Sequence, residues 1–263
     1  MIVLSAGMPR AGSGWHYNLV NDLMRTTGCA EATDIRARFH LQGVLTEVNC
    51  NIGVLSARRL ALVMIPALLG NTFVIKAHSR PTSASRLLQV LGLLRVTYIC
   101  RDPRDAMLSA MEYGRRATDK GGPNAFSPLT DFAPALDFML VYVHVWEGWL
   151  HEKNVLISRY EDLLGDYENE CIRLAEHLGL DASRPDVRAV MAQYRPASAE
   201  NQQGTHFFKG RVGRFRAAFS ASEQAVLAER FGPFLTRMGY APSQLARGSP
   251  GDAPRAGSPD QGA

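Results

Sequence analysis

A loop of small residues with one arginine follows the first apolar run of the chain, residues 2–6. The loop extends from Gly7 to Trp15 and reads Gly-Met-Pro-Arg-Ala-Gly-Ser-Gly-Trp. The residues after it, up to Met24, have the apolar spacing of a helix. A loop of this kind aims backbone N–H groups at one point, in front of the positive end of the helix dipole. The sequence therefore predicts a phosphate-binding loop, with a tight turn beside a surface arginine as the alternative.

The same loop has part of the pattern found in nucleotide triphosphatases. The spacing of Gly7 and Gly12 matches the opening of their phosphate-binding loop, which continues with Lys and then Ser or Thr. Here those two positions hold Ser13 and Gly14. The lysine that would reach a terminal phosphate and the hydroxyl that would bind magnesium are therefore absent from the expected register.

A lysine and a histidine stand two residues apart after the apolar run 73–75. Because residues two apart on a strand point to the same side, Lys76 and His78 are expected side by side where the strand leaves the sheet. A fixed cation beside a base is typical of a catalytic pocket. Taken alone, the pattern fits a polar strand end equally well.

An arginine and a serine flank a predicted helix start after the run 96–100. Asp102 is placed to cap this helix, Pro103 suits its first turn, and Asp105 stands where the acid of a capping box would be. Arg101 at the strand end and Ser109 about two turns into the helix could hold an anion from two directions.

Strands alternate with helices along the chain. Four short β-rich runs, at 2–6, 73–75, 96–100 and 155–158, lack polar alternation and are expected to be buried on both faces. Helical patterns lie between them, at about 13–24, 54–69, 82–93, 103–116 and 131–150, and a further one ends at Gly179. This order predicts an α/β fold, a three-layer sandwich with a central parallel sheet flanked by helices, and ligands at the carboxyl ends of the strands.

Composition narrows the class of protein. The chain has 263 residues, 46% hydrophobic and 21% charged, with a net charge of +4. This mild basic excess favours anionic ligands, and the scatter of the basic residues argues against nucleic-acid binding. The four cysteines lie far apart without metal-ligand spacing, so we expect no metal and a reducing, cytoplasmic location. We find no secretion signal and no membrane span, and a homodimer is compatible with the sequence.

The expected domain covers residues 1–240. Residues 241–263 are mostly Pro, Gly, Ser and Ala, which predicts a disordered tail. The polar stretch 112–130 could be a lid over an acceptor site or a solvated connection, and 30–55 is a second candidate for acceptor-binding loops. Apolar residues that suit a phenol or a lipophilic alcohol are Phe39, Met111, Tyr113, Phe126 and Phe132.

Together these motifs resemble the sulfotransferases that use 3′-phosphoadenosine 5′-phosphosulfate (PAPS). Pro9–Trp15 is similar to their 5′-phosphosulfate loop, usually Pro-Lys-Ser-Gly-Thr-Thr-Trp, and Lys76–His78 to their Lys-Thr-His motif. Arg101–Ser109 is similar to their 3′-phosphate motif, in which an Arg is followed eight residues later by a Ser. Tyr160–Leu163 and Lys209–Gly213 resemble their Tyr-Glu-Asp-Leu and Lys-Gly-x-x-Gly segments. The resemblance covers about residues 1–220 in order.

Roles for the residues follow from this resemblance. It implies that His78 is the general base toward an acceptor hydroxyl, or an amine as the less favoured choice, and that Lys76 and Arg10 neutralise charge on the transferring group. PAPS would be the sulfuryl donor, with no metal. The implied donor-binding residues are Arg10, Ala11, Gly12, Ser13, Gly14, Trp15, Arg101, Ser109, Tyr160, Lys209, Gly210 and Arg211.

The chain departs from the family pattern at several positions. Arg10 replaces Lys, Gly14 replaces the second Thr, Phe208 replaces the Arg before Lys-Gly, and Arg214–Phe215 replaces Asp-Trp. Two alternatives stay open. One is a P-loop kinase of a small metabolite, which would need a lysine at position 13 and an acidic magnesium ligand. The other is a nucleotide-binding module without catalysis.

Overall fold

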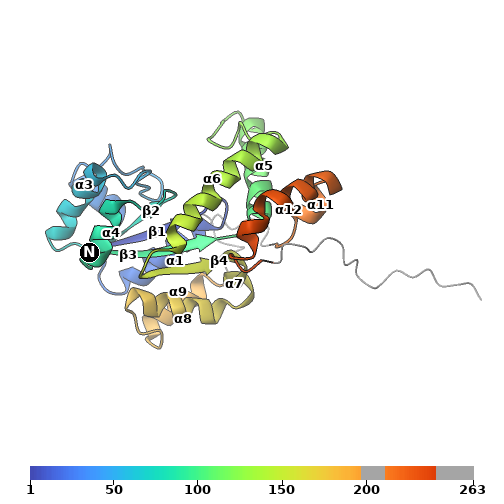
Figure 1. Ribbon diagram of the computed structural model, residues 1–263. Helices are drawn as coiled ribbons and strands as arrows, with labels where there is room; N and C mark the ends of the chain where they lie inside the picture. Colours follow the sequence, from blue (N-terminus) through green and yellow to red (C-terminus); the bar gives the residue numbers. More distant parts are fainter. Residues whose placement is uncertain (197–210, 241–263) are drawn as a thin grey trace, which may run out of the picture.

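The computed structural model describes residues 1–196 and 211–240 and contains a four-stranded parallel sheet (Figure 1). The strands are β1 (Ile2–Gly7), β2 (Phe73–Ala77), β3 (Leu94–Cys100) and β4 (Val155–Arg159), in the spatial order β2-β1-β3-β4. The central strand β1 is fully buried, as its unbroken apolar run predicts. Ser5 of β1 lies opposite Lys76 of β2 and Thr97 of β3, so the ends of these strands meet at one edge.

Helices follow the strands along the chain. In chain order they are α1 (Ser13–Arg25), α2 (Ala32–Arg38), α3 (Ala57–Leu68), α4 (Ser83–Val90), α5 (Pro103–Asp119), α6 (Phe132–Leu150), α7 (Tyr160–Gly165), α8 (Tyr167–Leu178), α9 (Pro185–Gln193), α11 (Phe215–Ala218) and α12 (Ala221–Leu235). None of those within 1–196 and 211–240 is long and apolar enough to cross a membrane.

Two apolar cores lie on opposite faces of the sheet. Val3, Val74 and Ile99 pack with α1, α8 and α9 on one face. On the other face, alternate strand residues such as Leu4 and Tyr98 pack with α5, α6 and α12. Figure 1 shows the helices above and below the sheet. The predicted three-layer α/β sandwich with a parallel sheet is confirmed.

Several helix boundaries differ from those expected. Helix α5 continues to Asp119, so the first half of the predicted loop 112–130 is helical. The single helix expected after Tyr160 is two helices, because Asp166, with φ −133° and ψ 48°, interrupts it. Gly179 caps α8 in the left-handed conformation, as predicted. The predicted tail, 241–263, lies outside the described residues.

Candidate active site

The loop after β1 is shaped by two residues with positive φ. Gly12 has φ 77° and is the N-cap of α1, and Arg10 has φ 63°. A Cβ atom on Gly12 would lie 2.7 Å from Cδ2 of Tyr160, so only glycine fits. The loop is held by the amide of Met8, which donates to the carbonyl oxygen of Ile99 at 2.9 Å. It turns the first amides of α1, which lack helical acceptors, toward the strand ends.

His78 lies just beyond β2 and is held by the same loop. Its Nδ1 is 2.6 Å from the carbonyl oxygen of Gly7. Burial and the nearby Lys76 ammonium lower the pKa of His78 to about 4, so the ring is neutral at pH 7. A neutral ring that donates from Nδ1 keeps an unprotonated Nε2, which is the atom a general base needs.

Two cations, Lys76 and Arg10, line the same cavity as this neutral histidine. Lys76 is 8% exposed, and burial together with the Arg10 charge lowers its pKa to about 8. Burial also lowers the pKa of Arg10. The Arg10 guanidinium lies over the Tyr113 ring, 4.2 Å from its centroid, and its Nε donates to Oγ of Ser109 at 3.3 Å. The predicted phosphosulfate and 3′-phosphate residues are therefore in direct contact.

Arg101 marks the end of β3. Its Nη2 donates to the carbonyl oxygen of Arg211 at 3.0 Å, and its guanidinium lies 4.5 Å from the centroid of the Tyr160 ring. Its Nε is buried and makes no hydrogen bond. Such an orphaned donor at the rim of a cavity is suited to an anionic ligand.

These residues line one cavity of about 410 Å³. Of the predicted residues within the described ranges, Ala11 and Arg211 do not line it: Ala11 is buried in the loop, and Arg211 meets Arg101 through its carbonyl group. Lys209 and Gly210 lie outside the described residues. The lining comprises Pro9, Arg10, Gly12, Ser13, Gly14, Trp15, Val48, Asn49, Asn51, Lys76, His78, Arg101, Ser109, Tyr113, Ala125, Phe126, Phe138, Tyr142 and Tyr160.

Trp15 and Tyr160, two of the implied donor-binding residues, belong to a buried aromatic group. Trp15 is 1% exposed and stacks on Tyr167, with ring centroids 6.1 Å apart. Its Nε1 donates to the carbonyl oxygen of Tyr194 at 3.0 Å. Tyr160 meets Trp15 edge to face, 6.2 Å between centroids. These contacts fix the floor of the cavity beneath the loop.

An aromatic wall closes the other side of the cavity. Tyr113 of α5 packs edge to face on Phe126, at 5.5 Å between ring centroids, and Phe126 packs on Phe138 of α6 at 5.6 Å. Phe138 in turn meets Tyr142 at 4.9 Å. Residues from both predicted acceptor segments, 30–55 and 112–130, reach the cavity, including Val48, Asn49 and Phe126. This wall is the apolar part of the site.

The other apolar candidates lie elsewhere. Phe39 lines a separate cavity beside α3, Phe132 packs on Phe219, and Met111 is in the core. Sequence reasoning missed Phe138 and Tyr142, which a helical periodicity alone assigns to the core. It also missed Asn49 and Asn51, which follow no strand and carry no motif.

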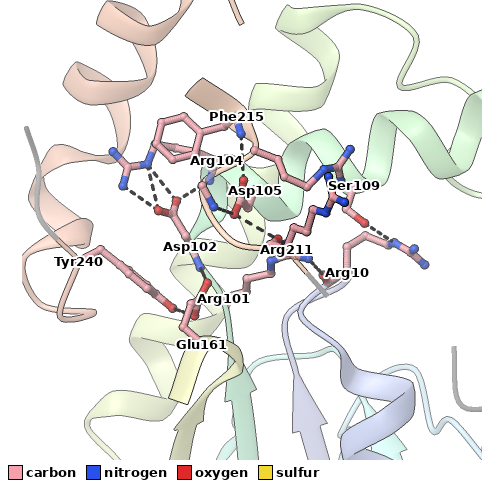
Figure 2. A network of polar contacts seen from close by, with 12 residues as sticks. Arg10, Arg101, Asp102, Arg104, Asp105, Ser109, Glu161, Arg211, Phe215 and Tyr240 are labelled. Carbon is pink, nitrogen blue, oxygen red and sulfur yellow. Dashed lines mark hydrogen bonds and ion pairs between the residues drawn. The ribbon is translucent and has the colours of Figure 1, made fainter. Parts of the chain in front are cut away.

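A polar network behind the site joins the β3 loop to the C-terminal segment (Figure 2). Asp102 caps α5 by accepting from the amide of Arg104, as predicted. The capping box predicted for Asp105 is wrong: its carboxylate accepts from the amides of Gly213, at 2.6 Å, and Phe215, at 3.0 Å. It thereby holds the segment that begins at Arg211 against Arg101.

Comparison with known proteins identifies the family. A family model described as the sulfotransferase domain matches residues 2–233. The chain belongs to the sulfotransferase family. Human sulfotransferase 4A1 is 25% identical over 137 residues, and its mouse counterpart 24%. Each match covers 50% of this chain and 48% of the relative, so the chain spans about half the length of the curated relatives it matches.

Solved sulfotransferase-fold structures share the architecture. Mouse sulfotransferase SULT7A1 complexed with PAP superposes with a TM-score of 0.63 at 16% identity, covering 89% of this chain and 83% of that one. Retinol dehydratase in complex with androsterone and the inactive cofactor PAP gives a TM-score of 0.58 at 18% identity, covering 89% and 80%. At these identities the likeness is one of fold, and it confirms the predicted sulfotransferase fold.

The site of this sulfotransferase departs from the family pattern with the charge kept at Arg10 and reversed at Arg214. Arg10 replaces a lysine, and its planar guanidinium can stack on Tyr113, which an ammonium does less well. Arg214, in place of the usual Asp, forms an ion pair with Glu112 of α5. Phe215, in place of the usual Trp, packs beneath the Arg104 guanidinium, 4.2 Å from its ring centroid.

Proposed function

We propose that this sulfotransferase transfers the sulfuryl group of PAPS to a hydroxyl group of a small-molecule acceptor. The observation that carries the proposal is the charge of the cavity. Its described lining contains Arg10, Lys76 and Arg101 and no Asp or Glu. Asp105 pairs with Arg101 at 3.7 Å from outside this lining, but Nε of Arg101 still makes no hydrogen bond. Three cations in one cavity suit a ligand that carries phosphate and sulfate groups. The PAP bound by the structural neighbours carries the phosphate groups of such a ligand.

The chain supplies positions and charge for the transfer. The acceptor oxygen forms a bond to sulfur as the bond from sulfur to the phosphate oxygen breaks. Nε2 of His78 takes the proton of the acceptor hydroxyl, and Lys76 and Arg10 stabilise the charge that passes to the departing bisphosphate. Because Nδ1 of His78 is fixed on Gly7, the ring is already oriented for this role.

The aromatic wall supports an apolar acceptor, such as a phenol or a lipophilic alcohol. Tyr113, Phe126, Phe138 and Tyr142 line the cavity together and offer no charge. We expect the reaction in the cytoplasm, where the four cysteines, all buried and unpaired, stay reduced. We further propose that residues 1–240 form the catalytic domain.

A calorimetric titration tests the donor site. We expect adenosine 3′,5′-bisphosphate to bind with micromolar affinity, and Arg101→Ala to weaken it by ~10- to 100-fold through loss of a charged hydrogen bond. Arg230→Ala, at an exposed position of α12, is the matched control and should bind like the wild type. Binding of ATP with magnesium in place of the bisphosphate would contradict the proposal and favour a kinase.

A transfer assay then separates an enzyme from a binding module. With PAPS and panels of phenols, alcohols and amines, we expect sulfated product from the wild type and turnover lowered by ~10² to 10⁴-fold in His78→Ala. The variant should still bind the bisphosphate. Tight bisphosphate binding with no product from any acceptor class would favour the module without catalysis.

A further inference from the structure

Helices α3 and α4 present an aliphatic surface far from the site residues described above. Figure 1 shows both helices together at one end of the sheet, beside β2. The side chains on their outer faces are exposed to an extent unusual for aliphatic residues. They are Leu62 (37% exposed), Ile65 (49%), Leu68 (70%), Leu69 (69%), Leu87 (58%), Val90 (83%) and Leu91 (58%). We call this set the α3–α4 face. Exposed aliphatic side chains gathered on two helices that contact each other mark an interaction surface.

Residues 48–101 contribute only basic charges around this face, and one of them, Arg86 of α4, is paired with Glu152 from outside that stretch. Residues 48–101 contain no Asp or Glu, and their seven basic residues are Arg58, Arg59, Lys76, Arg80, Arg86, Arg95 and Arg101. Lys76 and Arg101 belong to the site, and Arg95 is held by the carbonyl group of Leu178. The others lie at or near the helices, and Arg58 is exposed on the first turn of α3. The α3–α4 face is therefore aliphatic with basic residues at its edge.

A cavity of about 590 Å³ opens between α3 and the segment after α2. Arg58, Arg59 and Ser56 lie at the start of α3, and Leu62 and Ile65 line the cavity one and two turns further along the same helix. Cations at one end and hydrocarbon at the other match an amphiphile with an anionic head and an alkyl chain. The cavity thus has basic residues next to aliphatic residues, as the whole α3–α4 face does.

This pattern distinguishes between possible occupants. In a symmetric contact between two copies, Arg58 of each copy would find no acid among residues 48–101 of the other, which is unfavourable. Protein interfaces are enriched in aromatic side chains, whereas the α3–α4 face is aliphatic throughout. Helices with aliphatic residues on one side and flanking arginines are typical of surfaces that lie on anionic lipid bilayers.

We propose that the α3–α4 face docks this protein on an anionic lipid surface. Leu68 and Val90, the most exposed large apolar residue of each helix, enter the hydrocarbon boundary, while Arg58 contacts lipid phosphates. The contact is peripheral, because α3 and α4 are too short to cross a bilayer. This inference does not rest on the proposed sulfuryl transfer and can be tested without any acceptor.

Vesicle flotation of the full chain tests the proposal. We expect the wild type to float with phosphatidylcholine vesicles that contain phosphatidylserine, much less with phosphatidylcholine alone, and less as salt is raised. Arg58→Glu should lower the bound fraction by ~10-fold or more, because it removes one cation and adds one anion. Leu68→Asn/Val90→Asn should lower it at least as much by removing apolar contact.

Matched controls alter the same chemistry elsewhere. Arg230→Glu reverses an exposed charge on α12, and Val141→Asn removes an aliphatic side chain that is 59% exposed on α6. Both should float like the wild type. Near-ultraviolet circular dichroism and the thermal midpoint verify that every variant is folded.

Three results would overturn the assignment. The first is no flotation of the wild type with phosphatidylserine vesicles at low salt. The second is equal flotation of the Arg58 and control variants. The third is a wild-type dimer in analytical ultracentrifugation that becomes a monomer in Leu68→Asn/Val90→Asn, since the occupant would then be a second copy.

Discussion

Gly114 of α5 is the point where the segment after that helix rests on it. A Cβ atom at this position would lie 2.0 Å from the carbonyl oxygen of Phe126 and 2.5 Å from its carbonyl carbon. These are backbone atoms, so no rotation of a side chain can relieve the overlap. In Gly114→Ala the segment from 120 to 131 must therefore retreat from α5 by about 1 Å or more, since non-bonded carbon and oxygen atoms stay roughly 3.3 Å apart.

The retreat removes contacts whose strength can be estimated. The Phe126 ring meets Tyr113 at 5.5 Å and Phe138 at 5.6 Å. Each aromatic pair contributes about 0.5–1.5 kcal/mol, so the segment loses roughly 1–3 kcal/mol of local stability. Alanine is favoured over glycine inside a helix by about 1 kcal/mol, and this gain offsets part of the lost contact energy in the free energy of global unfolding. The segment is therefore loosened more than the protein is destabilised.

Hydrogen exchange measures this difference directly. The amides of Ser127 and Leu129 donate to Asn124 and Phe126 at 3.0 and 2.9 Å, within the segment. We expect both to exchange ~5- to 100-fold faster in Gly114→Ala, with the free energy of unfolding changed by less than about 2 kcal/mol. In an acceptor assay the KM for an apolar acceptor should rise while bisphosphate affinity stays within a few-fold.

A matched substitution in the same segment gives the comparison. Gly122→Ala places its Cβ in open space, with nothing within 4 Å, and should leave both amides protected. Equal protection of Ser127 in Gly114→Ala and the wild type would refute the reasoning. So would the same acceleration in Gly122→Ala, because the effect would then not arise from the contact with α5.

Three further predictions concern the loop, the pH profile and acid stability. Gly12→Ala should weaken bisphosphate binding by ~10- to 100-fold in calorimetry, because a Cβ at φ 77° is strained and overlaps the Tyr160 ring. The kcat/KM of the wild type should rise with pH near 4, as His78 loses its proton, and fall near pH 8, as Lys76 loses its charge. In Lys76→Arg, kcat/KM should not fall above pH 8. Burial lowers the pKa of His16 to about 3, so below pH 6.5 the unfolded chain binds more protons than the folded protein, and the free energy of unfolding falls as pH falls toward 4. In urea unfolding, the free energy of unfolding of His16→Leu should fall by roughly 3 kcal/mol less than that of the wild type over this pH range.

Most of the site could be predicted because its residues follow strands. In a parallel sheet the carboxyl ends of all strands meet at one edge, so the residues after β1, β2 and β3 converge whatever their separation in sequence. Arg10, His78 and Arg101 are such residues, and the cavity contains all three. Strand order and crossover geometry were enough to bring them together.

The rest of the site depends on contacts that no local pattern encodes. Phe138 and Tyr142 belong to a helix whose apolar residues surround it on most sides, so periodicity does not separate core from cavity. Asp105 matched a capping box in sequence, yet the amide that such an acid would bind, that of Asp102, is taken by Glu161 at 3.1 Å. Only the tertiary position of segment 211–215 explains why Asp105 turns away from its own helix.

Arg10 connects the two halves of the cavity energetically. Its guanidinium lies on the Tyr113 ring and bonds Ser109, so it touches the aromatic wall and the predicted phosphate-binding residues at once. We expect a contact of Arg10 with the proposed anionic donor to change its contact with Tyr113, and an acceptor packed against that ring to change the position of Arg10. Because such coupling is reciprocal, the proposed donor and acceptor should alter each other's affinity by the same factor. Replacing the guanidinium by an ammonium, as in Arg10→Lys, weakens the stacking on Tyr113 and should therefore reduce that factor.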